Sequence, residues 1–228
     1  MNTVFPAPQP ITVPVAGSDA AFPVRHVYCV GRNYAEHTKE PPFFFTKFAD
    51  ALVPVAPPGV AEIAYPLATK SLHHEIELVV AIGEHGVRLA PENANKIIWG
   101  YGVGIDMTRR DLQGQMKEKR WPWDIGKSFA QAAPISPLHP LSKTGHLSKG
   151  SIWLDVNGER RQQGDLTDMI WDVPHMLHFL SQYYELMPGD LVFTGTPAGV
   201  GAVGPGDRLH GGVDGLTTLS VTITPARW

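Results

Sequence analysis

The chain has 228 residues, of which 43% are hydrophobic and 18% charged, so it can bury one substantial core and its composition argues against disorder. Its formal net charge is −3, with no long run of either sign, which argues against nucleic acid or a membrane surface as the main partner. The single cysteine, Cys29, excludes an intrachain disulfide and a multi-cysteine zinc site, and without an evident signal peptide or an apolar stretch of roughly 18 residues we expect a cytoplasmic protein.

Glycine and proline, 23 and 21 residues scattered between short apolar runs, predict many short strands and few long helices. Residues 1–23 contain five prolines and are predicted to form an extended arm or a first β-ribbon. Apolar runs predict strands over residues 24–30, 43–47, 75–82 and 97–106. Residues 32–40 are compatible with a short helix or a loop.

The second half of the chain carries the best helix signal. Residues 169–186 are predicted to be helical, with Asp172 as the N-cap and Pro174 in the first turn. Shorter helices are expected over residues 90–94 and 111–119, the latter interrupted by Gly114. The Asn157-Gly158 pair after a strand at 153–157 predicts a hairpin. A strand at 190–194 should run into Gly195, and residues 216–223 alternate like an edge strand.

The strongest chemical signal is the pair of acidic residues Glu75 and Glu77 in an apolar strand. Side chains alternate along a strand, so the two carboxylates should share one face, about 6.6 Å apart along it. Two neighbouring carboxylates repel one another and are costly to bury, and a divalent cation would remove both problems. From this segment alone, an ordinary solvent-facing strand is an equally good interpretation.

The next predicted strand ends in a third acid. Between Gly100 and Asp106, every second residue is glycine until Asp106, so one face of the strand is bare backbone leading to a carboxylate. Glycine in a strand usually marks the close approach of a ligand or another backbone. Asp106 is therefore predicted to sit at a tight site, although it could also cap the helix that follows.

Three carboxylates without cysteine suit a hard cation such as Mg²⁺, Mn²⁺ or Ca²⁺. Zn²⁺ is a weaker alternative, because only one of His73 and His74 could share a face with the two glutamates. Two further signals are weaker still. The Gly-rich turn at residues 194–201 could bind a carboxylate through backbone N–H groups. Lys127 lies among apolar residues and, if buried, would need an anionic partner.

Taken together and in order, five motifs resemble the fumarylacetoacetate hydrolase family over residues 24–228. The motifs are residues 31–37 (Gly-Arg-Asn-Tyr-Ala-Glu-His), 74–77 (His-Glu-Ile-Glu), 104–111 (Gly-Ile-Asp-Met-Thr-Arg-Arg-Asp), 126–129 (Gly-Lys-Ser-Phe) and 194–201 (Thr-Gly-Thr-Pro-Ala-Gly-Val-Gly). The resemblance implies a mixed α+β, mostly β fold of rolled mixed sheets with few short helices, like the family's C-terminal domain. It also implies a catalytic domain over 24–228, preceded by the arm at 1–23, and a homodimer.

The resemblance further implies a metal-dependent hydrolase that cleaves a carbon–carbon bond in a 2,4-dioxo acid. The segments at 33–37, 41–45 and 107–111 are most similar to members that split fumarylpyruvate into fumarate and pyruvate during aromatic degradation. Oxaloacetate decarboxylation or hydrolysis of other acylpyruvates at the same site is the alternative. A non-enzymatic metal-binding module is a remote third interpretation, which a polar-lined cavity would argue against.

Site residues carry over by position. Glu75, Glu77 and Asp106 match the metal ligands, with Mg²⁺ the expected ion. The residues that match catalytic groups are His37, which would activate water, its partner Glu40, and Lys127, which would stabilise a pyruvate enolate. Those that match substrate contacts are Arg32, Lys47, Arg110, Gln113 and Thr196. Here only Thr38, Lys39 and Glu40 separate His37 from Pro41. This spacing implies a lid that is shorter than in other members, or one that is partly missing from the sequence.

Overall fold

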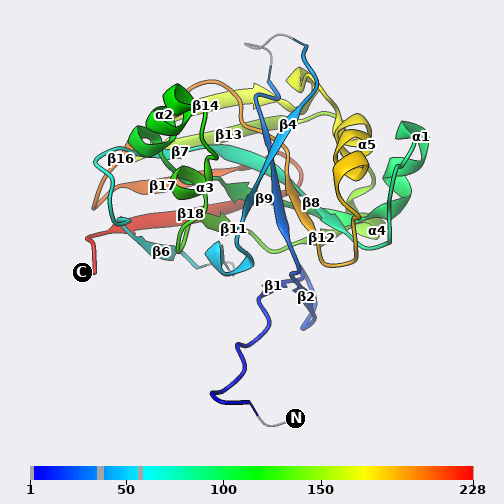
Figure 1. Cartoon of the computed structure of the whole chain (residues 1–228), viewed down its shortest axis with the longest axis horizontal. Coiled ribbons are helices and arrows are strands. Elements are labelled where there is room, and N and C mark those ends of the chain that lie inside the picture. Colours follow the sequence, from blue (N-terminus) through cyan, green and yellow to red (C-terminus); the bar gives the residue numbers. More distant parts are fainter. Residues whose placement is uncertain (1–2, 35–38, 56–58, 228) are drawn as a thin grey trace.

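The computed structural model describes residues 3–34, 39–55 and 59–227. Within these ranges the chain is mostly β, with strands in mixed sheets and a few short helices (Figure 1). Residues 3–10 are exposed and run away from the body as an extended arm (Figure 1). The arm is followed by a small hairpin of β1 (Thr12–Pro14) and β2 (Ala21–Pro23).

The largest sheet forms the centre of the molecule and has eight strands in the described residues. Its order is β4 (Phe43–Lys47), β3 (Val27–Gly31), β15 (Leu191–Phe193), β8 (Ile76–Ile82), β9 (Ile98–Ile105), β11 (Ala133–Ile135) and β5 (Leu52–Pro54), with β12 (His139–Pro140) also paired to β9. Most neighbours are antiparallel, but β3 runs parallel to β15 and β5 runs parallel to β11, so the sheet is mixed.

Two smaller sheets pack around it. One has the order β14 (Glu159–Asp165), β13 (Ser151–Val156), β17 (Arg208–Val213), β18 (Thr217–Thr224) and β6 (Ala61–Ala64), and the other β10 (Thr108–Arg109), β7 (Leu72–His74) and β16 (Gly201–Val203). The helices of the described ranges are short: α1 (Pro91–Ala94), α2 (Arg110–Lys119), α3 (Asp124–Lys127), α4 (Leu141–Thr144) and α5 (Val173–Tyr183), with 3₁₀ turns at Ala49–Ala51, Asn95–Ile97 and Leu166–Asp168.

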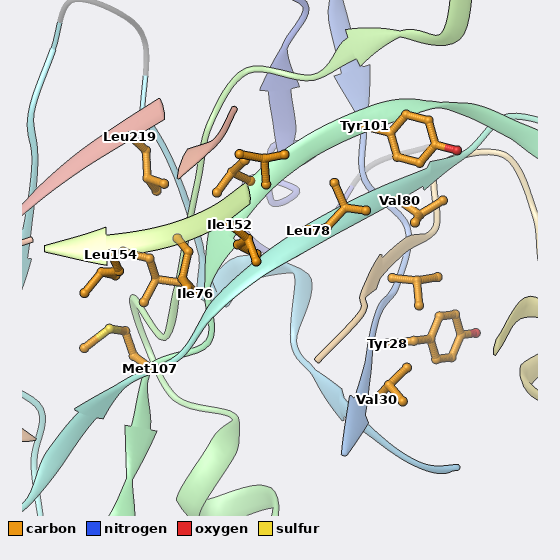
Figure 2. Close-up of a cluster of buried hydrophobic side chains, with 14 of the residues drawn as sticks. Tyr28, Val30, Ile76, Leu78, Val80, Tyr101, Met107, Ile152, Leu154 and Leu219 are labelled. Carbon is orange, nitrogen blue, oxygen red and sulfur yellow. The ribbon is translucent and has the colours of Figure 1, made fainter. Parts of the chain in front are cut away.

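Strand β8 is buried on both faces. Ile76, Leu78 and Val80 point into one core, where Ile152 and Leu154 of β13 meet them (Figure 2). Residues 79 and 81 point the opposite way, into a second core that includes residues of β15. A strand that is covered on both faces usually has an almost continuous apolar sequence, so an acidic residue within it indicates a special role.

The glycine face of β9 exists because other parts of the chain lie against it. A Cβ on Gly100 would fall 2.2 Å from the backbone oxygen of His139, and one on Gly104 would fall 2.4 Å from the ring of Phe193. The close approach predicted from the sequence is therefore present, but the approaching atoms at these positions belong to the protein. Asp106, one residue beyond the strand, remains free to face the site.

Most predicted elements are found within a few residues of their expected bounds. The strand over 43–47 is β4, and the Asn157-Gly158 turn joins β13 to β14, with positive φ at both residues (53° and 82°) as the tight hairpin requires. Asp172 caps α5 by accepting a hydrogen bond from the N–H of His175. Part of the segment at 32–40 lies outside the described residues.

Three expectations are wrong. Gly114 does not interrupt α2, because a side-chain-free position costs a helix only about 1 kcal/mol relative to alanine. The strand at the C-terminus is not an edge strand, since β18 lies between β17 and β6. The best helix begins at Val173 rather than residue 169, because Asp172 and Pro174 define its first turn.

None of the helices in the described ranges is long and apolar enough to cross a membrane. The boundary at residue 23 between an arm and a catalytic domain stays a prediction.

Two glycine-to-alanine substitutions should have opposite effects on stability. Gly100→Ala should lower the free energy of unfolding by about 1–3 kcal/mol, because the new methyl would meet backbone that has no room to move. Gly114→Ala should raise it by about 0.5–1 kcal/mol, because a Cβ there meets nothing within 4 Å and the helix gains rigidity. Denaturant unfolding measures both, and equal effects of the two changes would contradict this packing.

Candidate active site

Three buried carboxylates meet where β8 begins and β9 ends. Glu77 lies in β8, Glu75 directly precedes it, and Asp106 directly follows β9. The two strands are antiparallel, so the N–H of Asp106 donates to the backbone oxygen of Glu75 at 2.8 Å. The three residues are only 8%, 1% and 0% exposed, and one carboxylate oxygen from each lies within 4.8 Å of the others. The strand pattern predicted from the sequence therefore brings all three acids together.

Two buried lysines, Lys127 and Lys47, and Arg110 offset part of this negative charge. Lys127 Nζ lies 2.7 Å from Glu75 and 2.6 Å from Asp106, and Arg110 also bonds Glu75. Burial alone would raise the pKa of Glu75, but Lys127 and Arg110 outweigh it and lower that pKa to about 2. Burial acts to lower the pKa of Lys127, yet Asp106 and Glu75 raise it, so this ammonium stays charged at neutral pH. Lys127 has the anionic partners that its burial requires.

Glu77 has no comparable cation. Among the described residues it takes part in no ion pair, and its Oε2 accepts a hydrogen bond of 2.7 Å from the N–H of Gly195. Burial, followed by the charges of Asp106 and Glu75, raises its pKa well above the usual value. Among the described residues, Glu77 is thus the carboxylate of this cluster that the neighbouring cationic side chains leave unpaired.

The arrangement fits a hard divalent cation. All the ligand atoms are carboxylate oxygens, which Mg²⁺ and Mn²⁺ prefer. Oδ1 of Asp106 is 2.8 Å from Lys47 Nζ, yet it is buried without a hydrogen bond of good geometry among the described groups. Neither His73 nor His74 belongs to the cluster found in the described ranges, so the zinc alternative loses its ligands. Asp106 does not cap α2, which begins four residues later.

The carboxylates open onto a cavity of about 290 Å³. Glu75, Glu77 and Lys127 are among the residues that line it. Four cationic side chains line it, those of Arg32, Arg110, Lys117 and Lys127. Trp123, Phe45 and the segment at 196–200 complete the wall. Carboxylates suited to a cation and positive charge suited to an anionic ligand therefore line the same space.

Helix α2 supplies one side of the cavity through a single face. Arg110, Gln113 and Lys117 lie at positions i, i+3 and i+7, which share a face of an α-helix. Arg110 donates to both Glu75 and Gln113, which fixes its guanidinium beside the carboxylates. Lys117 has no carboxylate partner among the described residues, and its Nζ rests 4.7 Å from the ring centroid of Trp123.

The turn after β15 supplies the opposite side. Gly195 has φ +98°, and a Cβ there would lie 2.8 Å from the side chain of Asn33, so only glycine fits without strain. Its N–H bonds Glu77, and Thr196 next to it lines the cavity. The Gly-rich turn thus contacts a carboxylate through a backbone N–H, as predicted from the sequence, but the carboxylate is that of Glu77 rather than of a ligand.

The remaining predicted residues fall in three places. Arg32 lines the cavity. Lys47 lies behind it, 2.8 Å from Asp106 and bonded to the backbone oxygens of Met107 and Lys127, so a direct substrate contact by Lys47 stays a prediction. Glu40 is exposed, and its backbone oxygen accepts from the indole of Trp171 at 2.9 Å. His37 lies outside the described residues, so its pairing with Glu40 also stays a prediction.

Sequence reasoning missed two lining residues and one supporting residue. Lys117 could have been found from its spacing to Arg110 and Gln113. Tyr34 lines the same cavity as Glu77, with a buried hydroxyl that has no partner among the described groups, and burial raises its pKa. Gln162, fully buried and bonded to Thr196, gave no signal because its neighbours Arg161 and Gln163 are polar and exposed.

Comparison with known proteins agrees with this geometry. Residues 26–224 match the model of the fumarylacetoacetate (FAA) hydrolase C-terminal domain. The chain belongs to the fumarylacetoacetate hydrolase family. It is 43% identical to a fumarylpyruvate hydrolase of a Ralstonia species over 82% of this chain and 95% of the relative. It is 38% identical to the human mitochondrial oxaloacetate tautomerase over 87% of this chain and 91% of that protein.

A solved family member is closely similar in structure. It is the fumarylpyruvate hydrolase of Pseudomonas aeruginosa in complex with Mn²⁺ and pyruvate, which is 52% identical to this chain. The TM-score is 0.96, and the match covers 98% of this chain and 100% of the other. The mostly β fold expected from the family resemblance is therefore confirmed.

Metal affinity should depend on pH through Glu77. In the metal-free protein its pKa is raised by burial and by its acidic neighbours, so a cation must displace a proton from it. We expect Mn²⁺ affinity to fall as pH drops, by up to about tenfold per pH unit below the raised pKa of Glu77. Calorimetry in buffers of different ionisation enthalpy counts the protons released. A pH-independent affinity without proton release would contradict the assignment, and Glu77→Gln should weaken binding and remove the release.

Proposed function

We propose that the protein is a divalent-metal-dependent hydrolase that splits fumarylpyruvate into fumarate and pyruvate. The observation that carries this proposal is the buried carboxylate cluster beside a cavity lined by cationic side chains. Support also comes from the relatives, which include fumarylpyruvate hydrolases, one of them in complex with Mn²⁺ and pyruvate.

The reaction adds water across one carbon–carbon bond. Hydroxide goes to the distal carbonyl carbon to give fumarate, and a proton goes to the methylene carbon to give pyruvate. A cation held by Glu75, Glu77 and Asp106 would polarise the 2-oxo acid and favour the enolate form of the departing pyruvate. His37 keeps its proposed role as the base that takes a proton from water, with Glu40 as its partner.

Lys127 is suited to support negative charge on the leaving group. Two of its three N–H donors are taken by Glu75 and Asp106, and the residue lines the cavity. One donor is left for a ligand oxygen, and the raised pKa keeps the group a donor rather than a base. A fixed charge-assisted hydrogen bond of this kind stabilises the transition state in proportion to the charge that develops there.

The cationic lining of the cavity favours a substrate with a second carboxylate. Lys117 faces Arg110 and Arg32, and burial followed by these two charges lowers its pKa. Lys117 and Arg32 take part in no ion pair among the described residues, so their positive charge is stabilised by an incoming anion. Arg110 and Lys117 are seven positions apart, about 10 Å along the helix. An extended seven-carbon dicarboxylate such as fumarylpyruvate, roughly 8 Å long, spans a comparable length.

Oxaloacetate chemistry is the second candidate, because several relatives are oxaloacetate tautomerases and one is an oxaloacetate decarboxylase. Such reactions need the same enolate but no attacking water. Oxaloacetate is also a dicarboxylate, but a shorter one.

Four finer assignments complete the proposal: Mg²⁺ as the natural ion, the cytoplasm as the location, aromatic degradation as the context and a homodimer as the working state. The dimer has one supporting observation. Strand β4 is an edge of the large sheet, and its Phe44 packs beside Tyr183, which is 72% exposed. Light scattering of the purified protein would give the mass.

Turnover on defined substrates tests the main proposal. With Mg²⁺ or Mn²⁺ the protein should convert fumarylpyruvate to equal amounts of fumarate and pyruvate, and chelation of the metal should abolish the reaction. Asp106→Asn should lower kcat/KM by at least about a hundredfold, because it removes a ligand charge. Release of CO₂ from oxaloacetate, or its tautomerisation, without fumarylpyruvate cleavage would favour the second candidate. Full activity of His37→Ala would overturn its role.

Lys117→Met tests the preference for a dicarboxylate. It should lower kcat/KM for fumarylpyruvate by about tenfold, the value of one charge-assisted contact, and leave the uncharged-tail analogue acetylpyruvate nearly unaffected. Lys119→Met is the matched control, because Lys119 is in the same helix but lies outside the cavity lining, over Trp121. Equal losses on both substrates, or an equal effect of the control, would contradict the role given to Lys117.

A further inference from the structure

Gln162 is a buried amide in an otherwise exposed edge strand. It lies in β14, where Glu159, Arg160, Arg161 and Gln163 are exposed and Gln162 is 0% exposed. The pairing with β13 shifts here, since Leu154 faces Gln162 while Asp155 faces Arg160. Such a bulge leaves one residue unpaired and redirects the side chains beside it. The bulge aims Gln162 at the back of the active site.

The side chain of Gln162 makes four hydrogen bonds, which is its full capacity. Its Oε1 accepts from the N–H of Ile76 at 3.0 Å and pairs with Nδ1 of His74 at 2.9 Å. Its Nε2 donates to the backbone oxygen of Pro197 at 2.9 Å and to Oγ1 of Thr196 at 2.8 Å. An amide has two donors and two acceptor positions, so none is left over.

Two backbone partners fix which way this amide faces. The N–H of Ile76 can only donate and the carbonyl of Pro197 can only accept, so Oε1 must face the first and Nε2 the second. The bond to Thr196 then has a fixed direction, because Nε2 has only hydrogens to offer. Thr196 Oγ1 must accept from Gln162.

This direction determines what the threonine hydroxyl offers to a ligand. A hydroxyl has one hydrogen, and the hydrogen of Thr196 is not needed for Gln162. In the described residues Thr196 donates to no protein acceptor, and it lines the cavity. Its hydrogen is therefore available to an anionic oxygen in that cavity.

Gln162 also joins the carboxylate strand to the turn on the other side of the cavity. Ile76 lies between Glu75 and Glu77, and Pro197 follows Thr196 in the turn whose Gly195 bonds Glu77. The turn lies tight against β14, since a Cβ on Gly199 would meet the backbone oxygen of Arg161 at 2.0 Å. The amide and the metal carboxylates are thus held in one rigid frame.

We propose that Gln162 is a positioning residue that sets the Thr196 hydroxyl as a hydrogen-bond donor to the carboxylate of a 2-oxo acid. The proposal rests on the proposed function in that the ligand is a 2-oxo acid. Gln162 does not touch the ligand; it acts through the polarity of one hydroxyl.

Gln162→Glu reverses that polarity with little change of shape. One carboxylate oxygen still serves Ile76 and His74. The other, when ionised, can only accept, so it draws the Thr196 hydrogen toward residue 162 and leaves the carbonyl of Pro197 without its donor. Pyruvate binding to the Mn²⁺-loaded protein, measured by calorimetry, should weaken by on the order of tenfold or more. Thr196→Val should weaken pyruvate binding to a similar degree, whereas Thr196→Ser, which keeps the hydroxyl, should bind pyruvate about as well as the unaltered protein.

The double variant separates positioning from a general structural role. If Gln162 acts through the hydroxyl, adding Gln162→Glu to Thr196→Val should weaken pyruvate binding by no more than about twofold further. A full additional loss in the valine background would overturn the proposal, as would unchanged pyruvate binding in Gln162→Glu alone.

Gln163→Glu is the matched control. It adds the same charge one residue along the strand at an exposed position, and its pyruvate affinity should stay within about twofold of the unaltered protein. An equal loss in this control would also overturn the proposal.

A second substitution covers the case in which Gln162→Glu fails to fold by circular dichroism. Gln162→Met should be made both in the unaltered protein and in Thr196→Val. It should weaken pyruvate binding only where Thr196 keeps its hydroxyl, and an equal loss in both proteins would overturn the proposal. Absence of pyruvate binding by the unaltered protein would overturn the proposed function itself, which is a separate result.

Discussion

Mutual repulsion of three buried carboxylates is the constraint on which the rest of the site depends. Removing a charge from water costs several kcal/mol even after relaxation, and like charges a few ångströms apart add to that cost. Lys127, Lys47 and Arg110 pair with Glu75 and Asp106, whereas the pKa of Glu77 is raised, so its ionised form needs a further cation beside it. A divalent ion bound here would neutralise the carboxylates and would also stabilise the negative charge of an enolate.

The scaffold holds these charges together by rigid means. Strand β8 is packed on both faces, so Glu77 has no freedom to move toward solvent. Close contacts along the glycine face of β9 bring the strand that precedes Asp106 tight against its neighbours. Because the packing prevents the carboxylates from moving apart, Glu77 binds either a proton or a further cation in the folded state, and a cation that binds only there should also stabilise the fold by mass action.

The carboxylate cluster was predictable because it depends on local periodicity. Alternation places Glu75 and Glu77 on one face, and the glycine pattern marks Asp106 at the end of the neighbouring strand. The family motifs added the fold. Long-range contacts were not predictable in this way. Gln162 reaches the site because of a bulge in the pairing of β14 with β13, and no periodic pattern in the sequence predicts such a register shift. Helical spacing places Lys117 on the same face as Arg110 and Gln113, but recognising it as a site residue requires knowing which face of α2 meets the cavity.

The central claim is that the three carboxylates bind one divalent cation together with a 2-oxo acid. An anomalous-difference map from crystals soaked with Mn²⁺ and pyruvate tests it most directly. We predict a single strong peak bonded to carboxylate oxygens of Glu75, Glu77 and Asp106, with pyruvate beside it in the cavity. A map in which this position stays empty at saturating Mn²⁺, with Mn²⁺ bound elsewhere or nowhere, would contradict it.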